Sequence, residues 1–407
     1  MPLNSWQFLV LAVSAAVLLP TTTGVVRAVL FLLMNAVFAG SYWGLSMAPI
    51  AVAYCLTGYA CARLVAGRPK GALIVAVTVL TVIFAYLRGY SLHTLTTTDA
   101  VGGDSVLAFA GLSFLFFKMT HVVIDSAGGA IESLSFWRYL AYCTNFTTLL
   151  MGPIQRYQDF ISQWASPTFG QAGFEQKLDA VNRVLRGLLK AFALAPWLQP
   201  YVLGPGLAIE SLGAGALLLR AYAFYVFLYL DFSGYCDIVI GVGAIMGIRP
   251  PENFHFPFAA RNVSSYWLRV HRSLTLWLTD YVFTPTYRAL LSSERLGRHG
   301  FLALSAALML TMLVAGVWHG TTLNFVAFGL IHGVALVIVR GYEQVMVRWL
   351  GRSSFRAFSD SWPVTAVAVF LTYNFTSLAY AFFVLDLDES LRLFDRLAAI
   401  AIAGVTA

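Results

Sequence analysis

FLALSAALMLTMLVAGVWHGTTLNFVAFGLIHGVALVIVR, residues 301–340, is the stretch that decides the fold. It holds two apolar runs, 301–318 and 322–341, each long enough to cross or nearly cross a bilayer as a helix. His319 stands between the runs, directly before Gly320. Because glycine is common just after the last residue of a helix, the pattern predicts that His319 ends the first helix. Ionisable side chains at membrane depth are costly and mark functional sites, so His319 is either a residue that caps the helix or a candidate for chemistry.

The composition of the whole chain agrees with this stretch. Of 407 residues, 59% are hydrophobic and 11% charged, and the mean hydropathy is +0.75. Soluble domains average roughly 25% charged residues, so the composition excludes an ordinary cytoplasmic enzyme. The net charge of +7 is spread over short loops between apolar runs, which is typical of a membrane protein and argues against nucleic-acid binding. The four cysteines form no CxxC motif, so neither a disulfide framework nor a zinc site is indicated.

Apolar runs follow one another from residue 6 to residue 406, at about 6–20, 26–48, 49–66, 71–88, 105–124, 138–154, 184–203, 208–230, 232–248, 301–318, 322–341, 363–385 and 391–406. We therefore predict an all-α, polytopic membrane protein of about 11 transmembrane helices, with further re-entrant or interfacial helices. Residues 1–407 are interpreted as a single integral membrane domain. Basic residues after the first and third runs favour an N-terminus outside and these loops in the cytoplasm, and the acidic loop 89–104 suits the outside. The basic residues are Arg27 after the first run and Arg63, Arg68 and Lys70 after the third, and the acidic residues of the loop are Asp99 and Asp104.

Two segments have amphipathic patterns. Residues 174–190 combine apolar side chains at helical spacing with Lys and Arg, which predicts a basic helix on the cytoplasmic lipid surface or, equally, a solvated linker helix. Residues 262–290 place His271 on the apolar stripe of a predicted helix. We expect this helix to be interfacial or re-entrant, and His271 to be either a satisfied core histidine or part of a site.

Other polar residues in apolar runs allow structural and functional interpretations. His332 lies thirteen residues after His319, about 20 Å along a continuous helix, so the two cannot share a metal, and no metal centre is predicted. Asp231 and Asp237 need partners in a membrane run. They pair with Arg249, Arg261 or Arg269 and hold the helix packing, or they orient a catalytic histidine. Gly241, Gly243 and Gly247 indicate close helix packing.

Four segments together resemble the membrane-bound O-acyltransferase family, in its bacterial branch of alginate O-acetylation and D-alanyl transfer membrane proteins. They are GLSFLFFKMTHVVID (111–125), MGPIQRYQDF (151–160), the long stretch 231–283 and GVWHGTTLNFVAFGLIHG (316–333). The resemblance covers about 111–345, the expected family core. Val270 stands where the family usually has an aromatic residue, and residues 286–290, TYRAL, differ from the L-G-G-N-R of alginate-type members.

The resemblance implies an O-acyltransferase of the bacterial cytoplasmic membrane, with a central tunnel through the membrane. His319 is then the base that takes the hydroxyl proton of the acceptor, and His271 orients the acyl donor or hydrogen-bonds the reacting centre. Trp318, Asn324, Asp280 and Trp267 are expected around the pocket. The expected donor is a thioester, acetyl-CoA or the phosphopantetheine of an acyl carrier protein, with no permanently bound cofactor.

The expected reaction moves an acyl group, with acetyl favoured, to a cell-surface polysaccharide or to a periplasmic or extracellular partner. D-alanyl transfer to a teichoic acid-type polymer is the alternative. A secreted or membrane-anchored acyltransferase is an expected partner. In another hypothesis the chain is not itself the enzyme but an inactive membrane scaffold for a secreted acyltransferase. A proton-coupled transporter would require inverted repeats, and the sequence shows no such symmetry.

Overall fold

The structure is a computed structural model that describes residues 2–90, 111–202, 204, 208–294 and 296–406. The described residues form helices, turns and loops, with no β-strand among them. The all-α class predicted from the sequence is therefore confirmed. The predicted acidic loop with Asp99 and Asp104 lies outside the described residues.

Seven helical segments within the described ranges are long and apolar enough to cross a membrane, which supports the polytopic class. The predicted count of about eleven is not confirmed, because some apolar runs form halves of one helix and others are broken. Helix α1 (Trp6–Thr21) is apolar but shorter than the rest. The seven segments are Gly24–Gly44, Met47–Val65, Lys70–Arg88, Ala214–Met246, Gly300–His319, Leu323–Asp360 and Trp362–Val384.

The chain divides into two compact units. Unit 1 comprises Met1–Tyr90, Gly102–Leu194 and Asp231–Glu252, and the remaining segments, which include Ala195–Leu230 and Asn253–Ala407, form unit 2. Helix α10 (Ala214–Met246) contributes its first half to unit 2 and its second half to unit 1. The interpretation of residues 1–407 as one domain stays a prediction.

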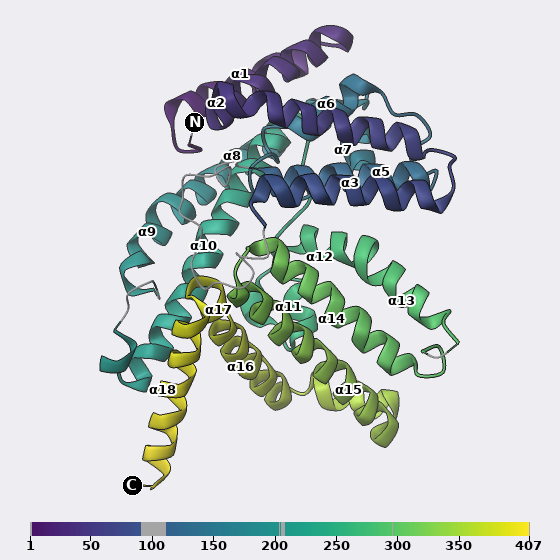
Figure 1. The fold of residues 1–407 in the computed structure, drawn as a ribbon. Helices are drawn as coiled ribbons and strands as arrows, with labels where there is room; N and C mark the ends of the chain where they lie inside the picture. The colour runs from purple at the N-terminus through teal and green to yellow at the C-terminus, as the bar shows by residue number, and fades with distance from the viewer. Residues whose placement is uncertain (1, 91–110, 203, 205–207, 295, 407) are drawn as a thin grey trace. The chain divides into compact units, whose positions relative to one another are not determined.

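Unit 1 packs long apolar helices against shorter ones (Figure 1). Helix α2 contacts α3, α5 and α6, and kinks at Gly44, whose φ of 62° suits glycine. The predicted runs 26–48 and 49–66 are the two halves of this helix. Besides α1, the elements are α2 (Gly24–Val65), α3 (Lys70–Arg88), α5 (Leu112–Ala127), α6 (Phe136–Thr144), α7 (Tyr157–Trp164), α8 (Phe174–Leu189) and η2 (Lys190–Leu194).

The amphipathic helix predicted over 174–190 is confirmed as α8, and charged pairs tie it to α10. Asp237 accepts hydrogen bonds from Arg183 Nε (3.0 Å) and Lys190 Nζ (2.7 Å), and Arg183 also pairs with Glu252 (2.5 Å). Asp237 therefore does not use Arg249, Arg261 or Arg269, which the sequence offered as partners. Burial disfavours the charge of Arg183, but Glu252 and Asp237 outweigh it and raise its pKa.

Close packing was the interpretation of the glycines near the end of α10, and Gly241 confirms it. A Cβ there would meet the side chain of Val184 on α8 at 2.7 Å. Two predicted boundaries in this region are wrong. Most of the runs 208–230 and 232–248 lies in the single helix α10, which continues through Asp231 and Gly234 without a break. The run 138–154 is helical only as far as Thr144, where α6 ends.

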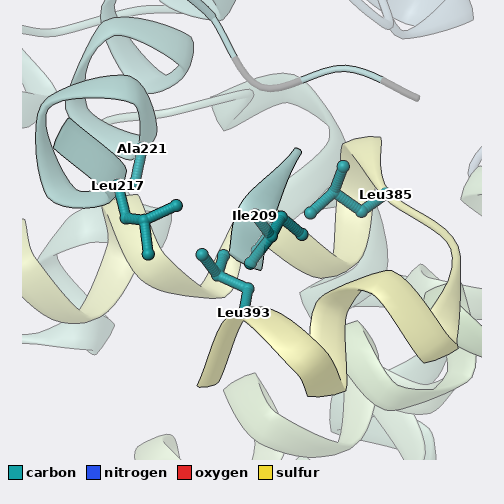
Figure 2. Packing of buried hydrophobic residues seen from close by; sticks show 6 residues of the cluster. Ile209, Leu217, Ala221, Leu385 and Leu393 are labelled. Carbon is teal, nitrogen blue, oxygen red and sulfur yellow. The ribbon is translucent and has the colours of Figure 1, made fainter. Parts of the chain in front are cut away.

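Unit 2 contains the remaining helices and a small apolar core between its C-terminal elements and the first half of α10 (Figure 2). Ile209, Leu217, Ala221, Leu385 and Leu393 are buried together there. The elements are α9 (Ala195–Leu198), η3 (Gln199–Tyr201), η4 (Ile209–Ser211), η5 (Pro257–Ala259), α11 (Val263–Trp267), α12 (Arg272–Leu278), η6 (Thr279–Phe283), α13 (Thr284–Leu291), α14 (Gly300–His319), α15 (Leu323–Asp360), α16 (Trp362–Ala379), α17 (Ala381–Val384) and α18 (Leu387–Thr406).

The expectation of one amphipathic helix over 262–290 is wrong. Helix α11 ends at Trp267, α12 begins at Arg272, and His271 between them has a left-handed backbone with φ 43°. The apolar stripe is nevertheless real in part, because Trp267, His271 and Leu274 are all buried. Helical spacing thus identified which side chains turn inward, but it did not reveal the break in the backbone.

Candidate active site

The hairpin of α14 and α15 builds the base of the site in unit 2. Helix α14 ends at His319, as the sequence predicted, and α15 begins at Leu323 after an extended Gly320 (Figure 1). A Cβ at Gly320 would overlap the ring of Phe325, so a larger residue at this corner would require that ring to move. Gly329 of α15 likewise lies against the backbone of Met312, and this close approach lets the two helices run side by side.

His319 is half-buried at the end of α14, among aromatic rings. Its ring centroid lies 4.6 Å from that of Trp318 and 5.0 Å from that of Phe383 on α17. Phe328, one turn into α15, lies on another side at 6.1 Å. The imidazole therefore stands at a helix end in an apolar pocket while part of it remains accessible.

His271 is held in the turn between α11 and α12. A left-handed backbone costs a residue with a side chain about 1–2 kcal/mol, so the surrounding contacts must enforce it. The backbone N–H of Arg272 donates to the carbonyl of Asn253 at 3.0 Å. The side-chain oxygen of Asn253 accepts from both the N–H (3.1 Å) and the hydroxyl (2.8 Å) of Ser273. Asn253 is fully buried and thus pins the residues that follow His271.

The side chain of His271 is buried near Trp318, with 6.1 Å between the ring centroids. Trp318 also contacts His319, so the two histidines predicted from the sequence converge on one tryptophan. His271 lies outside the seven candidate spans. Burial, and then the charge of His319, lower the pKa of His271 to about 3. His271 is therefore a neutral imidazole near pH 7, able to donate one hydrogen bond and accept another.

His332 is a third histidine of this region, and the sequence interpretation missed it. It is fully buried on α15, with its ring 4.5 Å from Phe328, 5.2 Å from Trp267 and 5.3 Å from Phe375. Neither ring nitrogen has a hydrogen-bond partner among the residues that the structure describes. Both His332 and His319 thus contact the ring of Phe328.

The spacing argument that separated His332 from His319 assumed a continuous helix. Gly320 ends the first helix, and the chain folds back into α15. The signal that could have corrected the argument was present, because a glycine followed by Thr322 and Asn324 is typical of one helix ending and another beginning. Even so, no group of three His, Cys, Asp or Glu side chains in the described ranges converges as metal ligands would.

Trp267 belongs to the same aromatic cluster. It is buried at the end of α11, and its carbonyl accepts a hydrogen bond from Thr275 Oγ1 at 2.7 Å. Its indole nitrogen, like the ring nitrogens of His332, has no hydrogen-bond partner within the part of the chain that the structure covers. Two buried side chains with unused polar atoms, 5.2 Å apart, therefore face one interior region.

Asn324 and Asp280 occupy other positions. Asn324 is buried at the start of α15, where its amide donates to the carbonyl of Phe382 at 3.1 Å and its oxygen accepts from the Thr322 hydroxyl. These bonds fix the entry into α15. Asp280 is an exposed residue of the π-helical turn η6. The roles predicted for both residues, and for Trp318 and Trp267, remain predictions.

Comparisons with known proteins identify the family of the chain. The model of the MBOAT, membrane-bound O-acyltransferase, family matches residues 27–384, which include segments of both units. The chain belongs to this family and is a membrane acyltransferase. The resemblance proposed from four sequence segments is thereby confirmed.

Individual relatives share the class and differ in their acceptors. A teichoic acid D-alanyltransferase of Bacillus subtilis is 27% identical over 69% of this chain and 69% of its own length. A probable alginate O-acetylase of Pseudomonas syringae pv. tomato is 31% identical over 60% of this chain and 46% of its length. A peptidoglycan O-acetyltransferase of Helicobacter pylori is 28% identical over 61% of this chain and 44% of its length.

Proposed function

We propose that this protein transfers an acyl group, with acetyl favoured, from a cytoplasmic thioester to a hydroxyl group of a cell-surface polysaccharide or of a periplasmic or extracellular partner. The observation that carries the proposal is the half-buried His319 at the end of α14, in contact with Trp318 and Phe383. Apolar rings around the imidazole keep competing water away from an activated ester.

In the proposed reaction His319 accepts the proton of the acceptor hydroxyl while the oxygen attacks the thioester carbonyl carbon. The carbon–sulfur bond then breaks, and the thiol leaves with a proton. Neutral His271 hydrogen-bonds the reacting centre, and Trp267 and His332 offer buried polar atoms on the side of Phe328. The donor is acetyl-CoA or an acyl carrier protein, reached through the tunnel that the family resemblance implies.

We also propose where the protein lies and which partner it has. The protein lies in the bacterial cytoplasmic membrane with its N-terminus outside, so that the basic loops holding Arg27 and Arg68 face the cytoplasm. A secreted or membrane-anchored acyltransferase receives or shares the acyl group when the acceptor is reached indirectly.

D-alanyl transfer to a teichoic acid-type polymer is the second candidate. The observation that favours it is the longer match to the teichoic acid D-alanyltransferase, which covers 69% of both chains. The higher identity with the alginate O-acetylase, 31% against 27%, favours acetyl. The two candidates share the base His319 and differ only in donor and acceptor.

The test measures ester-bound acyl groups on cell-surface polymers, released by mild base, in strains carrying wild-type protein, His319→Ala or His299→Ala. His299 is an exposed histidine beside the opposite end of α14 and serves as the control. We expect His319→Ala to abolish the ester groups and His299→Ala to retain them. Released acetate identifies the first candidate and D-alanine the second. Full modification with His319→Ala would contradict catalysis and leave a scaffold.

A further inference from the structure

A groove of about 790 Å³ in unit 1 lies away from the histidines of the candidate active site. Its walls come from the first turns of α2, from α6 and from the end of α7 and the residues after it. Two arginines, Arg27 and Arg138, line it, and none of its lining residues is Asp or Glu. The groove is thus positively charged without an acidic side chain of its own.

Arg27 is held in place by neutral groups. Its Nε donates to the carbonyl of Thr22 at 2.8 Å, and its guanidinium carbon lies 4.1 Å from the centre of the Phe169 ring. Arg138 is an exposed residue of α6. Neither arginine forms a salt bridge with any residue that the structure describes, in contrast to Arg183. Two arginines without carboxylate partners at one groove fit an anionic group with several oxygens, such as a phosphate.

Apart from Ser135 and Ser166, the rest of the groove is apolar, and it leads along a membrane span. Val25, Val29 and Leu32 line it at helical spacing, so they form one stripe down the first turns of the span Gly24–Gly44. Val25 is 78% exposed and Val29 is 50% exposed. Trp137, 62% exposed, also lines the groove, and tryptophan is enriched at the level of lipid headgroups. A free anion would use the arginines but not this stripe.

We propose that this groove binds an anionic phospholipid, with its phosphate between Arg27 and Arg138 and an acyl chain along the stripe of α2. Arg27 stands in the first turn of the span Gly24–Gly44, which is the depth of lipid headgroups, and Arg138 of α6 lines the same groove. The negative headgroup of such a lipid pairs with the two arginines, and its acyl chain covers the apolar side chains of the groove. The site is independent of the proposed reaction, so each can fail without the other.

The experiment counts lipids retained by the purified full-length protein in native mass spectrometry, with phosphatidylglycerol or phosphatidylcholine added. The double variant Arg27→Gln/Arg138→Gln is expected to bind phosphatidylglycerol roughly 25-fold more weakly, because each basic side chain near anionic lipid contributes about fivefold. Arg68→Gln, which removes an exposed arginine from the turn after α2, should bind like wild type. A melting-temperature rise with phosphatidylglycerol, lost in the double variant, gives a second readout.

Because Arg27 also contacts Thr22 and Phe169, the single variant Arg138→Glu provides a folded alternative. It changes only an exposed side chain, and we expect it to weaken phosphatidylglycerol binding and to leave phosphatidylcholine unaffected. Equal retention of both lipids by wild type, or phosphatidylglycerol binding that the variants leave unchanged, would overturn the proposal. Stabilisation by inorganic phosphate equal to that by the lipid would also overturn it, since the apolar stripe would then be irrelevant.

Discussion

Unit 1 and unit 2 both bury histidines in apolar helices, yet they use them differently. In unit 1, His121 Nε2 accepts the backbone N–H of Tyr157 at 3.0 Å, and Nδ1 donates to the carbonyl of Phe117 at 3.3 Å. In unit 2, His332 makes no hydrogen bond within the described ranges, and His271 sits in a left-handed turn. A histidine with both nitrogens committed fixes the backbone, whereas one with unused nitrogens can serve a substrate.

Buried Lys118 follows the pattern of His121. Its ammonium group donates to the carbonyls of Tyr142 (3.2 Å) and Cys143 (3.4 Å) and to the hydroxyl of Thr148 (2.7 Å). Two of the acceptors lie in the last turn of α6, and the third, Thr148, lies in the segment that follows this helix. The ionisable residues of α5 therefore hold the end of α6, Thr148 after it and the start of α7 in place, and we assign them to stability and not to chemistry.

Removing His121 should give the largest change in stability. His121→Ala leaves the buried N–H of Tyr157 without its acceptor and opens a cavity, so we expect the free energy of unfolding to fall by about 3–4 kcal/mol. Denaturant unfolding in detergent measures it, with the exposed His299→Ala as control. Acyl transfer per folded molecule should stay near the wild-type value. A folded His121→Ala protein without activity would break the distinction between the units.

Asn253→Ala should have the next largest effect. It removes the acceptor for the N–H and hydroxyl of Ser273, so we expect the free energy of unfolding to fall by about 2–3 kcal/mol. The turn that positions His271 also loses these hydrogen bonds. Acyl transfer should fall further than the loss of folded protein explains. Ser273→Ala removes one of the two bonds and should give about half of the destabilisation. If Asn253→Ala leaves transfer unchanged, the turn does not position His271.

Acid should destabilise the protein in part through His271. An unfolded histidine titrates near pH 6.5, while the pKa of about 3 keeps His271 neutral in the folded chain. As the pH falls from 7 to 5 the unfolded state takes up the proton and the folded state does not, which costs about 2 kcal/mol. Melting temperatures of wild type and His271→Gln should therefore converge or cross as the pH falls. Parallel curves would show that His271 titrates normally.

Exchanging the ring of His332 should have the smallest effect and sharpen the comparison. His332→Phe keeps an aromatic ring among Phe328, Trp267 and Phe375 but removes both nitrogens, so stability should change by less than about 1 kcal/mol. Transfer should fall about tenfold, the value of one hydrogen bond of roughly 1.4 kcal/mol. The matched exchange His121→Phe should do the reverse and destabilise without slowing the reaction. Identical behaviour of the two variants would contradict the assignment.

Much of the fold followed from hydrophobic runs. Three features were predictable from spacing: the end of α14 at His319, the amphipathic helix α8 and the apolar environment of His271. The breaks were not. The left-handed turn at His271 depends on hydrogen bonds that Asn253, eighteen positions earlier in the chain, accepts from Arg272 and Ser273, and no local pattern carries that information.

The site was predictable to a similar extent. The sequence singled out His271 and His319, whose roles remain predictions. It separated His332 from His319 in its argument against a shared metal, because distance along a continuous helix replaced distance in space. The partners of Asp237 were also missed, since Arg183 and Lys190 belong to the segment 174–190, which the sequence placed on the lipid surface or in a solvated linker. Pairing between helices is set by tertiary packing, which a single sequence does not display.

The central claim, that unit 2 carries the chemistry through His319, is tested most directly by the rate of acyl transfer from acetyl-CoA by purified protein in vesicles. Wild type and His319→Ala are compared at equal amounts of folded protein, with a secreted polymer of the source cell as acceptor. The account predicts a rate lower by roughly 10²–10⁴-fold for His319→Ala at an unchanged melting temperature. A rate within a factor of three of wild type would contradict it.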